Sequence, residues 1–157
     1  MAFGSAERLS WTLKPSQLLW KLSDKARQAR EARTLTADAA LGRRGEDLAH
    51  RYLQGLGYAV VARNYKPGID SEIDIVARKD EAVVFVEVKS RRSMEYGAPE
   101  RAMDMEKQKH IVRAARTYTT RAGIEWNRVR FDVISVVFTK PPSVLHQQDA
   151  FFHGRVI

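Results

Sequence analysis

The 157-residue sequence contains no cysteine. Disulfide bonds and thiolate metal sites are therefore excluded, and any metal ion must be held by oxygen or imidazole ligands. The sequence also lacks an apolar run close to the roughly 20 residues that a membrane-spanning helix needs. Charged residues interrupt the N-terminal segment where a signal peptide would have its apolar core. These absences lead us to expect a cytoplasmic protein, a setting that also fits the lack of cysteine.

Two further signatures of chemistry are missing. The four histidines do not have the spacing of a metal-binding motif such as HExxH. The glycines form no phosphate-cradling loop of the kind found in nucleotide-binding proteins. Each histidine is therefore expected to be a packing or surface residue.

Positive charge is in excess: 27 lysines and arginines face 19 aspartates and glutamates, which gives a formal net charge of +8. An excess of this size favours a polyanionic partner, either nucleic acid or an anionic membrane surface. Many soluble proteins are mildly basic, so the charge alone leaves the partner open.

The chain divides into three parts by composition. We expect a basic leader at 1–35, partly helical or disordered, and a compact domain at 36–140. A C-terminal tail at 141–157 carries Phe151 and Phe152, whose rings are expected to dock on the core. The leader contains a possible helix over Ser16–Arg33, and its basic residues are typical of a solvated segment.

The leader also allows a second interpretation. With Trp11 and Trp20 it has the features of an arm that binds nucleic acid or a membrane surface. Deletion of Met1–Thr34 would then abolish binding to anionic vesicles.

Hydrophobic periodicity predicts the elements of the compact domain. They are a helix from about Thr36 to Gly57, strands at Tyr58–Asn64, Glu72–Arg78 and Ala82–Lys89, a helix at Glu100–Ala122, and a strand at Phe131–Phe138. Pro67 and Gly68 predict a loop over Tyr65–Asp70. A strand–helix–strand passage implies a crossover, so the last strand should lie parallel to a neighbour. The fold class is therefore α/β, a mixed β-sheet flanked by helices in the order α-β-β-β-α-β.

The second and third strands should form a hairpin that carries a cluster of charged residues. Alternate residues of a strand share a face, so Glu87 and Lys89 point to the same side. A symmetric turn sets Asp74 opposite Glu87, with Cβ atoms roughly 4.5–5.5 Å apart. Ile73 and Ile75 then share the other face. Two facing carboxylates repel each other and need a compensating cation.

This arrangement suits the hydrolysis of phosphodiester bonds. Asp74 and Glu87 would hold Mg²⁺ or Mn²⁺, hard cations that prefer carboxylate and water oxygens. The ion would acidify a water and polarise the phosphoryl group. Lys89 would orient that water or stabilise charge on the phosphate. The alternative is an ordinary salt-bridged surface hairpin, since such residues are common on a sheet face.

Glu46 is a third acid in an unusual place. With Ala49 and Leu53 it lies along the inward stripe of the first helix, where glutamate is rare without a partner. It is therefore a candidate metal ligand. It is also near the helix N-terminus, where a negative charge is favoured, and could pair with Arg43 or Arg44 instead. The sequence leaves both interpretations open.

Several short motifs are similar to those of a known family. They are Gly42-Arg43-Arg44-Gly45-Glu46, Arg63-Asn64-Tyr65, Glu72-Ile73-Asp74, Phe85-Val86-Glu87-Val88-Lys89, Lys107 and Arg130-Phe131-Asp132. Together they resemble the bacterial YraN-type family, from about Gly42 to Val137. That family is placed by similarity in the PD-(D/E)xK nuclease superfamily, near the Holliday junction resolvases.

The resemblance implies a restriction-endonuclease-like fold and a Mg²⁺-dependent site. Asp74 and Glu87 would be metal ligands, Lys89 the catalytic lysine, and Glu46 the helix glutamate of resolvase-like members. Lys107 matches a helix position that the family usually keeps basic. Ser71 departs from the glycine common in the family, and Ile73 stands where the superfamily has proline.

Two functional hypotheses follow. The first is a metal-dependent endonuclease acting on DNA, with branched DNA and a homodimer suggested by analogy with the resolvases. The second is a non-catalytic nucleic-acid-binding module on the same fold, which would act through phosphate contacts. The basic residues available to either are Arg43, Arg44, Arg91, Arg92, Lys107, Lys109 and Arg113.

Overall fold

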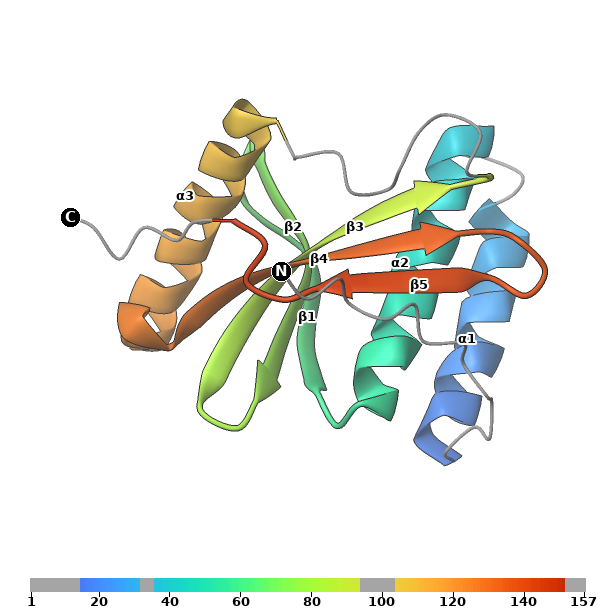
Figure 1. Cartoon of the computed structure of the whole chain (residues 1–157), viewed down its shortest axis with the longest axis horizontal. Helices are drawn as coiled ribbons and strands as arrows, with labels where there is room; N and C mark the ends of the chain where they lie inside the picture. Colours follow the sequence, from blue (N-terminus) through green and yellow to red (C-terminus); the bar gives the residue numbers. More distant parts are fainter. Residues whose placement is uncertain (1–14, 32–35, 94–103, 152–157) are drawn as a thin grey trace.

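The computed structural model describes residues 15–31, 36–93 and 104–151. Their main elements are α1 (Pro15–Glu31), α2 (Ala37–Gly55), β1 (Ala59–Gly68), β2 (Ser71–Lys79), β3 (Ala82–Arg91), α3 (Met105–Ala122), β4 (Val129–Val137) and β5 (Ser143–Gln147) (Figure 1). A short 3-10 turn, Trp126–Arg128, precedes β4. The predicted α/β class, a mixed sheet flanked by helices, is confirmed.

The sheet has five strands in the order β1-β2-β3-β4-β5. Neighbours run antiparallel except for β3 and β4, which are parallel and joined through α3. The predicted crossover is therefore present. The hairpin between β2 and β3 closes at the pair Lys79 and Ala82, so its turn is at Asp80-Glu81 as expected.

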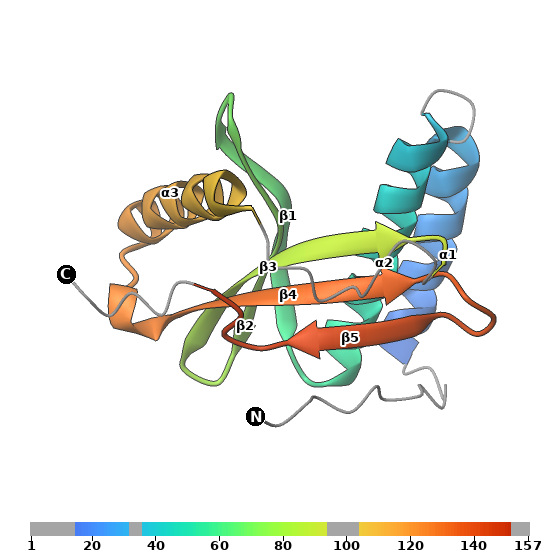
Figure 2. The same ribbon diagram turned by 45° about the horizontal axis from the view of Figure 1, so that its top comes forward.

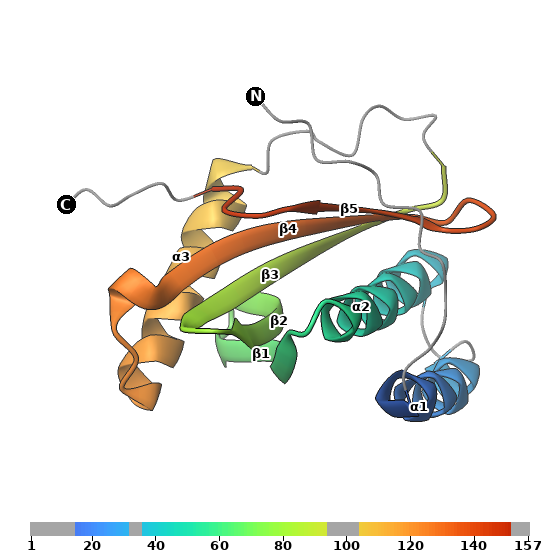
Figure 3. The same cartoon turned by 60° about the horizontal axis from the view of Figure 1, so that its bottom comes forward.

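Helices cover both faces of the sheet (Figure 3). On one face, Leu48 and Leu53 of α2 pack against Val84 and Val86 of β3. On the other face, α3 packs through Ile111 and its neighbours against Phe85 and Phe131. Alternate residues of β3 thus enter different halves of the core, which is the pattern expected for a central strand buried on both sides.

One predicted alternation is wrong. Ile73 packs in the core half beneath α3, whereas Ile75 packs in the half beneath α2. The regular ladder between β2 and β3 ends at the pair Ile75 and Val86. The residues of β2 before Ile75 pair with β1 instead, and Figure 2 shows this hairpin bending away from β3. The two-residue period fails where the strand changes direction.

Two other segments differ from the prediction. The prediction of a loop over Tyr65–Asp70 is wrong as far as Gly68, because β1 continues to that residue. Pro67 is tolerated since β1 is an edge strand and its register shifts between Tyr65 and Gly68. Ser143–Gln147, expected within a tail, form the edge strand β5. Phe151 is buried as predicted, whereas Phe152 lies outside the described residues.

The helix expected at Ser16–Arg33 corresponds to α1, which packs along α2 on the side away from the sheet (Figure 3). Trp11 lies outside the described residues, as do Glu100–Met103 of the expected third helix. Within the part of the chain that the structure describes, no helix is long and apolar enough to cross a membrane.

Candidate active site

Asp74 and Glu87 come together where β2 and β3 separate. The Oδ2 atom of Asp74 accepts a hydrogen bond of 2.8 Å from the backbone N–H of Val88. This contact links the two strands just beyond the last regular pair of their ladder. The structure therefore brings the two predicted acids into one site, one from each strand.

Burial makes this pair costly to ionise. It raises the pKa of Asp74 to about 7, and the negative charge of Glu87 adds to the effect. The pKa of Glu87 is also raised by burial, while the nearby ammonium of Lys107 opposes the rise. Because neighbouring carboxylates titrate together, a second negative charge at this site is unfavourable, and an approaching cation makes it less so.

Two lysines lie beside the acids. The Nζ atom of Lys107, from α3, is 3.5 Å from Oε1 of Glu87. The other oxygen of Glu87, Oε2, is buried and has no hydrogen-bond donor among the described residues. Lys89 is the next residue on the same face of β3, and burial lowers its pKa while the charge of Glu87 opposes this. The predicted acid, acid and lysine grouping is thus assembled, with Lys107 added.

Glu46 lies nearby but is held by arginines. Its Oε2 is 3.3 Å from Nη2 of Arg63 and 3.6 Å from Nη1 of Arg43. Burial raises the pKa of Glu46, the charge of Asp74 raises it further, and the two arginines oppose both. Of the two interpretations left open by the sequence, the ion pair with Arg43 is observed. Glu46 is nevertheless close enough to Asp74 for the charge of Asp74 to act on it.

The fit of a divalent ion depends on the donor atoms that the site presents. In the described parts of the chain, no three acidic or imidazole side chains are grouped as a ready-made metal site. Asp74 and Glu87 nevertheless fit Mg²⁺, which often takes one or two carboxylates and completes its shell with water and substrate phosphate. The buried, unpartnered oxygen of Glu87 supports this fit.

The other predicted basic residues are spread around the same end of the sheet. The guanidinium of Arg44 lies 4.9 Å from the centre of the Phe138 ring. The Nη2 atom of Arg92 is 3.3 Å from Oδ1 of Asp38, which lies at the start of α2. Arg91 is the last residue of β3. These residues therefore lie at the end of the sheet where β3 and β4 finish.

A buried ionic network behind Glu46 was not predicted. Asp47 is fully buried and binds Arg63 of β1 together with Arg27 and Gln28 of α1. Although burial raises its pKa, these hydrogen bonds hold the pKa of Asp47 below the ordinary value. The available signal was an acid within the inward-facing part of a helix, a feature that the helical pattern attributes to Glu46.

A second buried network was also missed. Asp132 of β4 accepts hydrogen bonds from Arg130 at 2.8 Å and contacts Nε2 of His146 at 2.7 Å. The backbone N–H of Asp149 donates to the same carboxylate. Asp132 thus fastens β5 and the segment after it to the sheet, which gives it a structural role away from the acidic pair.

The fold and the acidic pair define an α/β protein with a carboxylate site at the opening of a hairpin. Comparison with known sequences gives the family to which the chain is similar. The family model described as "Uncharacterised protein family UPF0102" matches residues 45–136. This range contains Glu46, Asp74, Glu87 and Lys89.

Individual relatives cover more of the chain. A UPF0102 protein of Solibacter usitatus is 42% identical over 135 residues, which span 85% of this chain and 98% of that protein. One of Geobacter sulfurreducens is 44% identical over 113 residues, 71% of this chain and 88% of the relative. One of Rhodococcus jostii is 41% identical over 114 residues, 71% of this chain and 96% of the relative. The chain belongs to the UPF0102 family.

Proposed function

We propose that this protein is a divalent-metal-dependent endonuclease that hydrolyses phosphodiester bonds in DNA. The observation that carries the proposal is the buried pair of Asp74 and Glu87 at the strand opening, flanked by Lys89 and Lys107. The resemblance to PD-(D/E)xK nucleases and the positive net charge of +8 support it. Branched DNA is the substrate class that the likeness to junction resolvases favours.

The residues have distinct roles in this proposal. Asp74 and Glu87 would hold Mg²⁺ or Mn²⁺, and Glu46 could join them if it left Arg43 and Arg63. When bound, the ion supplies a Lewis acid for the phosphoryl group and lowers the pKa of a water. Both carboxyl groups must be deprotonated to bind it, which their raised pKa values make dependent on pH.

The lysines act on the substrate side of the pair. Lys89 shares a face of β3 with Glu87 and would orient the attacking water or stabilise the charge that develops on the phosphate. Burial lowers the pKa of Lys89, so its proton is more easily transferred than that of a solvated lysine. Lys107 offsets the charge of Glu87 when no substrate is present.

A cleavage panel tests the proposal. Linear, flapped and four-way DNA are incubated with Mg²⁺, with Mn²⁺ or with EDTA. Wild type should cut at least one substrate only with a divalent ion, and Glu87→Gln and Lys89→Met should reduce the rate at least about 100-fold. Glu81→Gln is the matched control, because Glu81 lies at the far end of the same hairpin with its side chain 91% exposed. No cutting by wild type, or equal cutting by Glu87→Gln, would refute the proposal.

One observation favours a second function, a nucleic-acid-binding module without catalysis. Glu46 is paired with two arginines, and the described residues contain no group of three potential metal ligands. Such a module would bind DNA with the same salt-dependent affinity in EDTA and in Mg²⁺, and Glu87→Gln would leave binding unchanged.

A further inference from the structure

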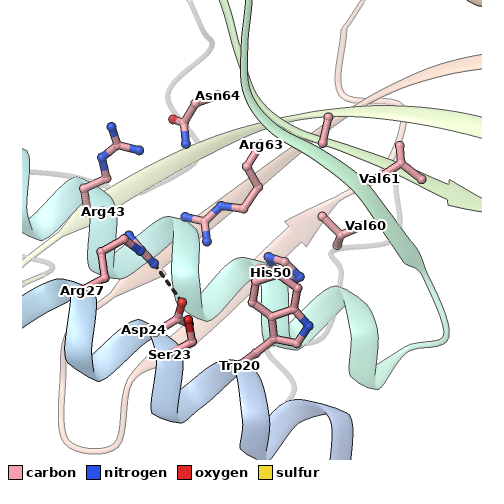
Figure 4. Close-up of a pocket in the computed structure, with 11 residues that line it drawn as sticks. Trp20, Ser23, Asp24, Arg27, Arg43, His50, Val60, Val61, Arg63 and Asn64 are labelled. Carbon is pink, nitrogen blue, oxygen red and sulfur yellow. Dashed lines mark hydrogen bonds and ion pairs between the residues drawn. The ribbon is translucent and has the colours of Figure 1, made fainter.

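An open pocket of about 440 Å³ lies between α1, α2 and β1. Figure 4 shows its two ends: arginine side chains gather with Asn64 at one, and Trp20 lies against His50 at the other. Its lining includes Trp20, Arg27, Arg43, His50, Arg63 and Asn64. The pocket therefore combines a cationic end with an aromatic end.

Buried polar atoms in the pocket lack partners. His50 is only 3% exposed, yet neither of its ring nitrogens has a hydrogen-bond partner among the described residues. The Nε atom of Arg63 is also buried and has no hydrogen-bond partner among the described residues. Unsatisfied buried groups are unfavourable and uncommon in folded proteins, so their concentration in one pocket points to a ligand.

The imidazole is suited to a neutral hydrogen-bonding partner. Burial, and then the positive charge of Arg63, lower the pKa of His50 to about 4. At neutral pH the ring is therefore uncharged and offers one donor and one acceptor. The ring of Trp20 covers it with centroids 4.5 Å apart, while 42% of the Trp20 residue is exposed to solvent.

The arginine end is suited to an anion. The ion pairs behind the pocket join the guanidinium groups of Arg27, Arg43, Arg51 and Arg63 with the carboxylates of Asp24, Glu46 and Asp47. The side chain of Arg43 is 38% exposed, so one guanidinium at this end of the pocket is accessible from solvent.

Glu46 connects the pocket to the acidic pair. Arg43 and Arg63 line the pocket and both approach Glu46, which also feels the charge of Asp74. A DNA strand that extends from the acidic pair toward the pocket would therefore meet the cationic end of the pocket first. It would then meet the aromatic end, at Trp20 and His50.

We propose that this pocket holds one unpaired nucleotide of a DNA strand, with its phosphate at Arg43 and its base against Trp20 and His50. The inference rests on the proposed function for its DNA substrate. A guanidinium binds phosphate, an exposed indole stacks with any base, and a neutral imidazole can pair with a base edge. The entering base displaces the indole of Trp20 from the ring of His50 and stacks on the indole. The two ring nitrogens of His50 then become available for hydrogen bonds with the base. A paired base must first leave its stack, so a duplex should bind more weakly than a single strand.

Binding in EDTA tests the pocket apart from cleavage. The probe is a single strand of about 12 nucleotides that contains 2-aminopurine, compared with its duplex. Wild type should bind the single strand more tightly and quench the 2-aminopurine fluorescence through stacking. Trp20→Leu should lose the quenching and weaken binding about fivefold or more, whereas Trp20→Phe should retain both.

Charge controls accompany the aromatic variants. Arg43→Gln should weaken binding of the strand about tenfold. Arg121→Gln removes the same charge from the exposed end of α3 and should change affinity less than about twofold. If the two variants lost affinity for the strand equally, the attraction to DNA would be a general effect of charge. That result would overturn the assignment of the pocket.

His50→Leu separates a ligand role from a structural one. The substitution removes both unpartnered nitrogens at similar volume, so the thermal midpoint should stay equal or rise while binding of the strand weakens about fivefold. A lower midpoint with unchanged binding would show that His50 is structural.

The two proposals fail in different ways. Absence of cleavage with intact, Trp20-dependent binding would refute the nuclease alone. Active cleavage with wild-type quenching in Trp20→Leu, or preference of wild type for the duplex, would refute the pocket alone. Tight binding of free dAMP with no binding of the strand would assign the pocket to a mononucleotide and overturn the proposal.

Discussion

Asp74 accepts a hydrogen bond from the backbone N–H of Val88 across the gap where β2 leaves β3. The contact places a side-chain acceptor where the regular ladder between the strands has just ended. One oxygen of the carboxylate is thereby fixed to the backbone of β3, next to Glu87. The separation of the strands thus orients one acid toward the other.

The first prediction concerns the stability of Asp74→Asn. Burial and the charge of Glu87 raise the pKa of Asp74 to about 7, so the folded protein holds a proton there that the unfolded chain releases near pH 4. A raised pKa means that this contribution to stability is present at low pH and is lost as pH rises toward 7. Asparagine cannot ionise, so the variant should be more stable at pH 8 by on the order of 2 kcal/mol.

Urea unfolding in EDTA at pH 8 and at pH 4 measures this difference. The gain should disappear at pH 4, where wild-type Asp74 is already protonated in the fold. A variant that is less stable than wild type at pH 8 would show that the carboxylate is not under electrostatic strain.

The second prediction concerns Gly45, where α2 approaches β3. A Cβ atom at this position would lie 1.7 Å from Oγ and 2.9 Å from Cβ of Ser90. The hydroxyl can rotate away but the Cβ atom cannot, so α2 must shift, at a cost of about 1–3 kcal/mol. Because Glu46 and Lys89 adjoin the two contacting residues, Gly45→Ala should also impair divalent-ion-dependent activity.

Gly42→Ala is the matched control for this change. A Cβ atom at Gly42 meets nothing within 4 Å, and alanine favours a helix interior by up to about 1 kcal/mol. Thermal unfolding should therefore rank Gly42→Ala at or above wild type and Gly45→Ala below it. Equal stability of the two variants would contradict the tight contact with Ser90.

The third prediction concerns Asp47. Its hydrogen bonds keep its pKa below the ordinary value, so its contribution to stability is present above that value and is lost as pH falls through the lower, folded-state pKa. Asp47→Asn leaves Arg27 and Arg63 without their shared carboxylate. The free energy of unfolding at pH 7 should fall by about 3–5 kcal/mol.

Urea unfolding at pH 7 checks this loss, with Glu81→Gln as an exposed ion-pair control that should change stability by less than about 1 kcal/mol. The deficit of Asp47→Asn should narrow as pH falls below the ordinary aspartate pKa and through the lower, folded-state pKa of Asp47. A loss that is equal in both variants would mean that the buried network adds nothing to stability.

The hairpin and its acids could be predicted because local rules determine them. Asp80 and Glu81 form a short turn, and the register that follows pairs Ile75 with Val86, which sets Asp74 near Glu87. The parallel β4 also followed from the intervening α3. These features depend on residues that are close in sequence or on connection rules.

The remaining features depend on contacts between distant residues. Glu46 and Asp47 are neighbours in α2, and only the packing of α1 and Arg63 decides that Asp47 is the fully buried one. The strand β5 has few apolar residues, and its place is set by pairing with β4 and by the contact of His146 with Asp132. The pocket of Trp20 and His50 exists only once α1 lies on α2.

Binding of Mn²⁺ to the metal-free protein tests the central claim most directly. Titration followed by electron paramagnetic resonance at pH 8 should show bound Mn²⁺ in wild type and in Glu81→Gln, and at least about tenfold weaker binding in Glu87→Gln and Asp74→Asn. Affinity in wild type should fall as pH drops below 7, because protons then compete for Asp74. Unchanged Mn²⁺ binding in both site variants would contradict the account.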